Sequence, residues 1–216
     1  MPAAAGLPLA SGARRDEKRA MIDADTIAFY QARAPHWVFH SGEHCSHQLD
    51  SFLDRLTPGA AVLELGCGGG RDAARMRERG FVVDATDATP ALVTRANQAF
   101  ALGARVMAFH ELAADAQYAG VWAHASLLHC PRAALPCVLA RIHRSLLPGG
   151  WHFASFKLGN GEGRDLLGRL HNFPPPEWLI AAYVAADFVI EAQEIYAGKA
   201  SDGTQRDWID LTVRKP

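Results

Sequence analysis

A glycine-rich turn between an apolar segment and a charged segment constrains this chain more than any other feature. Residues 61–65 are mostly apolar and suit a strand covered on both faces of a parallel sheet. Gly66, Gly68 and Gly70 follow at once, and glycine adopts backbone angles closed to other residues, so a ligand can lie against the main chain. The helix expected over 71–79 would point free N–H groups at this loop, which favours an anionic ligand group. The segment predicts a nucleotide-type site.

Two kinds of nucleotide site compete for the loop. In the dinucleotide fingerprint G-x-G-x-x-G, counted from Gly66, the last glycine would fall on Arg71, so the fingerprint fails. The motif present is E-x-G-x-G-x-G, with Glu64 two residues before the first glycine. A glycine-rich run also occurs as a plain tight turn, and this alternative stays open from the loop alone.

Composition limits the class of protein. A chain of 216 residues with 49% apolar and 21% charged residues is long enough for one α/β domain of a globular protein. Its 22 Lys and Arg residues balance 23 Asp and Glu residues, so no basic excess indicates nucleic acid. No apolar stretch reaches the ~18 residues of a membrane span. The four cysteines form no C-x-x-C pair, which predicts reduced thiols and a cytoplasmic location.

The first part of the chain predicts a tail and a cover. Residues 1–20 mix Ala, Gly and Pro with a charged cluster and predict a flexible tail. Residues 21–57 predict a helical lid, with one helix over 23–30 and a second over 46–56. Residues 58–216 would then form the ligand-binding domain. The lid contains three aromatic residues that could contact a ligand, namely Tyr30, Trp37 and Phe39.

Histidines are concentrated in this lid. Residues 36–47 contain four histidines and a cysteine. His36, His40 and His44 are spaced so that a helix would align them as metal ligands. A proline before the segment and Gly42 within it argue against one continuous helix. We therefore expect solvated or hydrogen-bonded histidines in the lid, and no metal.

An acid after the second expected strand extends the site. Asp87 lies about twenty residues past the glycine loop, where a carboxylate can accept hydrogen bonds from both ribose hydroxyls. The alternative is that Asp87 only caps the helix expected over 90–100. Ala88 beside it would let a nucleoside approach closely.

Several motifs, in this order, resemble the class I S-adenosylmethionine-dependent methyltransferases. The motifs are the acid–glycine loop 64–70, Asp87, the stretch 118–131 with its V-x-A-x-x-x-L-x-H pattern, the P-G-G turn 148–150, and a final hairpin over 188–196 and 208–213. The resemblance covers about residues 49–214 and extends loosely to small bacterial members that include the tellurite-resistance group. It implies an α/β, doubly wound, Rossmann-like sheet of seven strands, mostly parallel with an antiparallel last strand.

The resemblance also implies S-adenosylmethionine as the cofactor. In that family the acid of the loop motif, here Glu64, contacts the amino group of the methionine moiety. The family's usual Asp near the adenine is replaced here by Ala108 or Phe109. The expected cofactor contacts are Glu64, Gly66, Cys67, Gly68, Gly70, Arg71, Asp87, Ala88, Ala108, Phe109, Ala123, His124, Leu128, Tyr30 and Trp37.

The implied reaction moves a methyl group from the sulfonium to a small-molecule acceptor by in-line displacement. His129 is the candidate catalytic base, because an imidazole titrates near neutrality. A structural histidine that ties the exit loop to the next helix is the alternative. The glycine-rich loop 157–165 predicts either a solvated connection or a mobile cover, and in a cover Lys157 and Arg164 would suit an acidic acceptor.

Two other functions remain as alternatives. One is a nicotinamide-dependent oxidoreductase, which Arg71 at the third glycine position disfavours. The other is an S-adenosylmethionine-binding protein without catalysis. We expect a monomer or homodimer whose partner is a small-molecule methyl acceptor, with no nucleic-acid or membrane partner.

Overall fold

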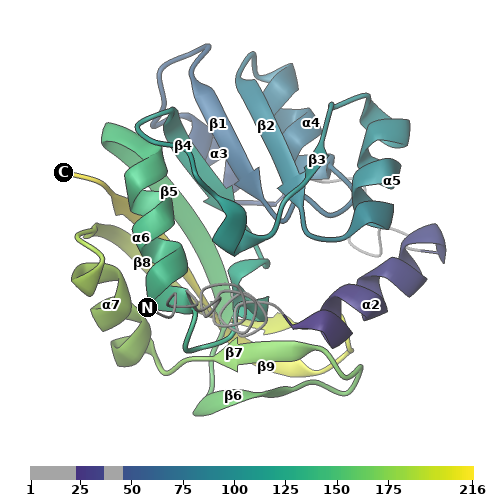
Figure 1. The fold of residues 1–216 in the computed structure, drawn as a ribbon. Helices are drawn as coiled ribbons and strands as arrows, with labels where there is room; N and C mark the ends of the chain where they lie inside the picture. The colour runs from purple at the N-terminus through teal and green to yellow at the C-terminus, as the bar shows by residue number, and fades with distance from the viewer. Residues whose placement is uncertain (1–22, 37–45) are drawn as a thin grey trace, which may run out of the picture.

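The structure, a computed structural model, describes residues 23–36 and 46–216. Seven strands of this part form one sheet in the order β3-β2-β1-β4-β5-β9-β8, with helices on both faces (Figure 1). The strands are β1 (Ala61–Leu65), β2 (Val82–Asp87), β3 (Arg105–Val106), β4 (Tyr118–Ala123), β5 (Leu146–Lys157), β8 (Val189–Lys199) and β9 (Gln205–Arg214). The expected doubly wound α/β fold is confirmed.

The sheet is parallel except at one place. β1 pairs in parallel with β2 and β4, and the same direction continues to β3 and β5. β9 runs antiparallel to both of its neighbours, β5 and β8. β8 and β9 are consecutive strands joined by a short turn, so they form a hairpin, as a direct connection between neighbouring strands requires. The antiparallel last strand is therefore confirmed, inserted before the edge strand.

The helices cover the sheet on two sides. They are α2 (Ala24–Arg33), α3 (Leu49–Leu53), α4 (Arg71–Glu78), α5 (Pro90–Phe100), α6 (Leu135–Ser145) and α7 (Pro176–Ala185), with short 3-10 turns η1 (Ala34–His36), η2 (Phe109–Glu111) and η3 (Leu127–His129). In the described ranges, none of them has the length and apolar character needed to cross a membrane.

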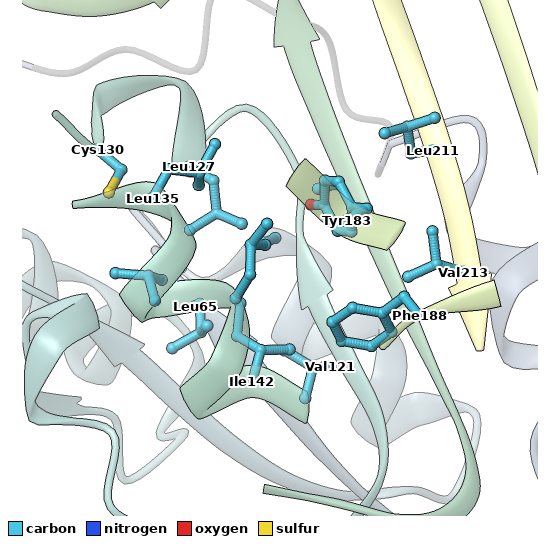
Figure 2. Close-up of a cluster of buried hydrophobic side chains, with 14 of the residues drawn as sticks. Leu65, Val121, Leu127, Cys130, Leu135, Ile142, Tyr183, Phe188, Leu211 and Val213 are labelled. Atoms are coloured by element: carbon cyan, nitrogen blue, oxygen red, sulfur yellow. The ribbon is translucent and has the colours of Figure 1, made fainter. Parts of the chain in front are cut away.

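Side chains that point alternately to the two faces of the sheet form a hydrophobic core on each face. Val62 packs with Trp122 and α3 on one face of the sheet. Leu63 and Leu65 face the opposite side, where they join the large cluster under α6 and α7. Figure 2 shows Leu65 in this cluster. Both Val62 and Leu63 are fully buried. Successive side chains of a strand point to opposite faces, so β1 is covered on both sides, as its apolar run predicted.

A second, two-stranded sheet replaces the solvated connection or mobile cover expected after β5. β6 (Gly161–Arg164) pairs antiparallel with β7 (Leu170–Phe173). Glycines at alternating positions hide the strand from a sequence pattern, because they carry no side chain that shows period two. A Cβ atom on Gly159 would lie 2.8 Å from that of Phe173, so this glycine permits close packing at the start of the hairpin.

Two other elements are shorter than the sequence predicted. The helix expected over 46–56 is α3, of five residues, and ends in turns before β1. The third strand, expected over 105–109, has two residues, because Phe109 begins the 3-10 turn η2. The predicted lid residues Trp37 and Phe39, and His40 and His44 of the histidine alignment, lie outside the described residues.

Candidate functional site

A pocket of about 280 Å³ lies at the carboxyl ends of β1, β2 and β4, with α2 along its other side. Open α/β sheets bind ligands at this edge, where the loops after the strands meet. Most of the residues expected at the site line the pocket. They are Tyr30, Glu64, Gly66, Cys67, Gly68, Arg71, Asp87, Ala88, Ala108, Phe109, His124 and His129.

Three expected contacts lie behind the pocket wall. Gly70 begins α4 with φ 84°, and a Cβ atom there would press on Leu102 and Ala96. Gly70 is thus required at this helix N-terminus for two reasons: its backbone is in the left-handed region, and its neighbours leave no room for a side chain. Ala123 and Leu128 belong to the large core under α6. Their contact with a ligand stays a prediction.

Other lining residues were not among the expected contacts. They are Asp23, Thr26, Ile27, Gly69, Asp72, Thr89, Leu92, Ala125 and Ser126. The polar residues at α2 belong to no sequence motif. They line the pocket because α2 packs beside it. Asp72 directly follows Arg71, and Ser126 lies within the stretch 118–131, so nearness to a motif is the sequence signal that could have identified them.

The carboxylate of Glu64 has one unsatisfied oxygen atom at the pocket. Its side chain is 4% exposed, and its Oε2 accepts no hydrogen bond within the described part of the chain. Burial, with the nearby carboxylates of Asp72 and Asp87, holds the pKa of Glu64 well above its usual range. A buried acceptor without a donor costs free energy. A ligand ammonium group would supply the missing donor and favour the charged carboxylate.

The glycine loop is held by β2 and by the loop after β4. The N–H groups of Gly66 and Cys67 both donate to the carbonyl of Thr86, at 2.8 Å each. Gly66 has φ 84°, and a Cβ atom there would collide with the side chain of Ser126. Gly68 has φ 53°, and no atom lies within 4 Å of where its Cβ would be. The loop therefore presents bare backbone to open space at Gly68.

Asp87 joins the loop to the next turn. Its Oδ2 accepts from the N–H of Gly68 at 3.0 Å, and its Oδ1 accepts from the N–H of Thr89 at 2.8 Å. Burial raises the pKa of Asp87 above its usual value. Asp87 thus orders the turn before α5, but it does not cap the helix, whose N-cap residue is Thr89. A carboxylate has about four lone-pair sites, so it retains capacity for ligand hydroxyls in the pocket it lines.

Asp72 connects α4 to the chain that precedes α3. It accepts hydrogen bonds from the Ser46 N–H at 3.0 Å and the Ser46 hydroxyl at 2.6 Å. The Trp122 indole N–H donates to the same carboxylate at 3.0 Å. Because the Ser46 hydroxyl proton is used on Asp72, the 2.9 Å contact from His124 Nδ1 to Ser46 Oγ requires a proton on that nitrogen. Burial lowers the pKa of His124, which keeps the imidazole neutral.

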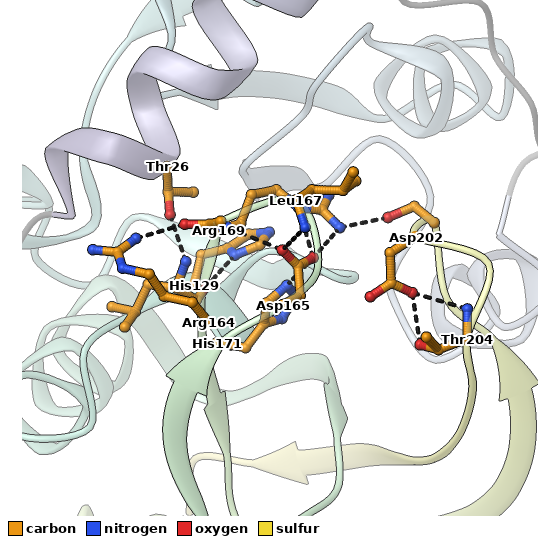
Figure 3. Close-up of polar contacts among 12 residues, drawn as sticks. Thr26, His129, Arg164, Asp165, Leu167, Arg169, His171, Asp202 and Thr204 are labelled. Atoms are coloured by element: carbon orange, nitrogen blue, oxygen red, sulfur yellow. Dashed lines mark hydrogen bonds and ion pairs between the residues drawn. The ribbon is translucent and has the colours of Figure 1, made fainter.

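A polar network closes the α2 side of the pocket (Figure 3). His129 Nδ1 lies 2.6 Å from the Leu170 carbonyl, which can only accept, so Nδ1 carries the proton. His129 Nε2 is then the acceptor for the Tyr30 hydroxyl at 2.9 Å. Arg169 donates to the same hydroxyl at 2.8 Å. Burial, with His171 nearby, lowers the pKa of His129 to about 3, so its imidazole is neutral at pH 7.

The network is anchored by a buried ion pair. Arg169 is 2% exposed and bonds Asp165 through Nε at 2.9 Å and Nη2 at 2.5 Å. His171 Nε2 lies 3.1 Å from the same Asp165 oxygen. Further contacts reach α2 from the hairpin, since the Leu170 N–H donates to Thr26 Oγ1 at 2.8 Å. These bonds fix α2 against the β6–β7 hairpin.

Residues 62–150 match the family model of a methyltransferase domain. No curated protein sequence matches the chain. Among solved structures, the 1,6-didemethyltoxoflavin-N1-methyltransferase of Burkholderia thailandensis, with bound 1,6-didemethyltoxoflavin and S-adenosylhomocysteine, has a TM-score of 0.72 at 23% identity, over 98% of this chain and 93% of that chain.

Two archaeal structures have the same fold. A putative methyltransferase of Haloferax volcanii, in complex with a methyltransferase activator, has a TM-score of 0.69 at 16% identity, over 89% of this chain and 96% of that chain. A methyltransferase of Methanosarcina mazei has a TM-score of 0.67 at 15% identity, over 75% of this chain and 95% of that chain. At these identities the structures establish a shared fold.

Proposed function

We propose that this chain is a class I S-adenosylmethionine-dependent methyltransferase and that it transfers a methyl group to a small-molecule acceptor. The observation that carries the proposal is the buried Glu64 oxygen without a partner in the pocket. It stands at the acid position of the glycine-loop motif, where a cationic amine would satisfy it.

The pocket residues fit the cofactor. Glu64 would accept from the amino group of the methionine moiety, and Asp87 from the ribose hydroxyls. The bare backbone at Gly68 leaves room for the ligand, and the start of α4 with Arg71 suits its carboxylate. Ala88, Ala108 and Phe109 offer an apolar surface for the adenine. When bound, S-adenosylmethionine supplies a methyl group on a sulfonium centre.

We propose that residues 21–57 act as a lid, of which α2 is the described part beside the pocket. Tyr30 lies between the pocket and the hairpin, where its ring would cover the cationic end of the cofactor. A covered site excludes water and holds an acceptor atom in line with the methyl group. His129 serves in this scheme as a neutral acceptor that positions the Tyr30 hydroxyl, because its lowered pKa makes it a weak base.

The acceptor is proposed to be small, because α2 leaves a pocket of about 280 Å³. Arg164, expected to favour an acidic acceptor, instead pairs with Asp23 at 2.8 Å and Asp25 at 3.2 Å. Lys157 is 3% exposed, and burial lowers its pKa to about 8. Neither side chain lines the pocket, so an anionic acceptor loses both of its expected supports.

We also propose that the protein is a monomer or homodimer and that it is located in the cytoplasm. Cys67, Cys130 and Cys137 are free thiols, which supports a reducing compartment.

Calorimetric titration with S-adenosylhomocysteine and with NAD tests the cofactor. We expect S-adenosylhomocysteine to bind and NAD not to bind. Glu64→Gln should weaken S-adenosylhomocysteine binding by ~1 to 3 kcal/mol, because it removes the anionic acceptor, with the fold unchanged. The exposed Glu78→Gln on α4 is the matched control and should bind as the wild type does. Equal affinity of Glu64→Gln and wild type would make Glu64 a strand residue without a ligand role.

A radiolabelled methyl donor offered with a panel of small-molecule acceptors tests transfer. We expect label to move to at least one acceptor. Binding of S-adenosylhomocysteine without transfer to any acceptor would instead favour a cofactor-binding protein without catalysis.

A further inference from the structure

Three potential metal ligands meet on the β8–β9 hairpin, outside the pocket. His47 precedes α3, Glu194 lies on β8 and Asp210 lies on β9. One ligand atom of each residue lies within 4.8 Å of the other two. The fold thus brings an imidazole from the first quarter of the chain to two carboxylates near its end.

The two carboxylates face each other across the hairpin. Glu194 and Asp210 are register partners of the antiparallel pair, so their side chains share one face. Like charges directly opposite each other destabilise such a pair. The Gln48 amide donates to Glu194 at 2.8 Å, which does not neutralise the charge. In the described part of the chain, no Lys or Arg forms an ion pair with either acid.

Asp210 carries an unsatisfied atom. Its side chain is 4% exposed, and Oδ1 accepts one long hydrogen bond, from the Tyr196 hydroxyl at 3.3 Å. Its Oδ2 is buried and has no hydrogen-bond partner among the described residues. A buried anionic oxygen without a donor requires an explanation, and a bound cation is one.

His47 lies near the two carboxylates without bonding to them, at separations that leave room for a cation between the three side chains. Its ring meets Tyr196 edge to face at 5.9 Å between centroids. Within the described ranges, no hydrogen bond and no ion pair of 4.0 Å or less joins His47 to either acid, although all three ligand atoms are within 4.8 Å. Metal–ligand bonds of ~2.0–2.2 Å hold ligand atoms apart by more than a hydrogen-bond length, since each atom contacts the ion and not its neighbour.

We propose that His47, Glu194 and Asp210 bind a divalent transition-metal ion, with Zn²⁺ as the probe. Imidazole suits zinc and the later transition metals, and two carboxylate oxygens complete a nitrogen–oxygen set with an open position for water. The ion neutralises the facing carboxylates. It also ties the chain before α3 to the sheet edge, one residue from Ser46, which bonds Asp72 and His124 at the pocket.

Calorimetric titration of Zn²⁺ into the full chain tests the site, with no affinity tag and after removal of metal by a chelator. We expect one ion per chain in this site. His47→Gln, Glu194→Gln and Asp210→Asn should each weaken binding at least about tenfold, because each removes one ligand. Asp207→Asn on the same strand is the matched control, because its side chain is exposed, and should bind Zn²⁺ as the wild type does.

Thermal unfolding separates metal binding from folding. Zn²⁺ should raise the unfolding temperature of the wild type and of Asp207→Asn, but not that of Glu194→Gln, whose side chain is exposed and whose replacement leaves the core intact. Zinc binding that is absent from the wild type, or that all three ligand variants retain at full affinity, would overturn the proposal. The second result would place zinc on other histidines of the chain.

Discussion

The glycine loop and α2 face each other across one pocket, but their polar groups are satisfied in different ways. In the loop wall, Glu64 keeps a buried oxygen without a described partner, and Gly68 borders open space. In the α2 wall, the Tyr30 hydroxyl both accepts from Arg169 and donates to His129. The first wall has a buried acceptor that no described residue satisfies, whereas the protein itself satisfies the Tyr30 hydroxyl in the second wall.

The difference separates recognition from closure. Unsatisfied buried groups are costly, so a protein keeps them where a ligand repays them. Satisfied networks fix the relative position of the elements that carry them. This difference supports the proposal that the loop wall recognises the ligand and that the α2 wall closes the pocket. Variants on the two sides should affect different measurements.

Arg169→Met should have the largest effect, on stability. It leaves the buried Asp165 carboxylate without its guanidinium partner, and breaking a buried pair in this way costs about 3–5 kcal/mol. Chemical denaturation measures the change. The double variant Arg169→Met with Asp165→Asn removes both charges and should be more stable than Arg169→Met alone. A double variant that is less stable would mean that the two side chains contribute independently.

Gly66→Ala should destabilise the loop wall by about 2–4 kcal/mol, from a strained positive φ and a collision with Ser126. It should also weaken S-adenosylhomocysteine binding. Gly80→Ala is the matched control, because Gly80 has φ 85° with nothing near its Cβ position. The control should lose only ~1 kcal/mol of stability and should bind S-adenosylhomocysteine as the wild type does. Equal losses of stability in both variants would show that the contact with Ser126 adds nothing to the cost of a side chain at position 66.

Acid should weaken the α2 wall through His129. Its pKa is lowered from 6.5 to about 3 on folding, chiefly by burial, so the unfolded chain binds the proton more tightly. The stabilisation is present above pH 6.5 and is lost as pH falls towards 3. Between about pH 7 and pH 5, protonation of this one group in the unfolded chain lowers the free energy of unfolding by about 2 kcal/mol. Urea denaturation of wild type and His129→Gln should show the smaller loss in the variant. The same loss in both proteins would exclude His129 as the source.

Arg164→Ala should have the smallest effect. Its ion pairs with Asp23 and Asp25 join the hairpin to α2, but the side chain is 42% exposed. Exposed pairs contribute about 0–1 kcal/mol, and salt screens them. Denaturation at low and high salt should give a difference below about 1 kcal/mol that shrinks as salt rises. A larger loss, insensitive to salt, would show that Arg164 holds the wall by packing.

The loop wall could be predicted from the sequence, and the α2 wall could not. Glu64, Gly66 and Asp87 belong to strand ends and turns whose form depends on neighbouring residues. The Tyr30–His129 and Leu170–Thr26 bonds join residues 99 and 144 positions apart, and no local pattern encodes them. The hairpin β6–β7 was missed for a related reason, because its glycines show no alternation.

The histidine segment shows the same limit. His36, His40 and His44 have the spacing that would align metal ligands on a helix. The residue that the fold brings to two carboxylates is His47, whose partners lie about 150 residues further on. The spacing of ligands along a chain is informative only when they share one element.

The insertion of β9 has a consequence for how the sheet is assembled. In the sheet β8 pairs with β9 alone, and β9 lies between it and β5. During synthesis, the five strands from β1 to β5 can pair as they emerge, while β8 must wait for residues 205–214. Until then β8 is an unpaired strand with an exposed edge. Completion of the sheet, and of the Glu194–Asp210 face, is therefore a late event that any truncation within β9 would prevent.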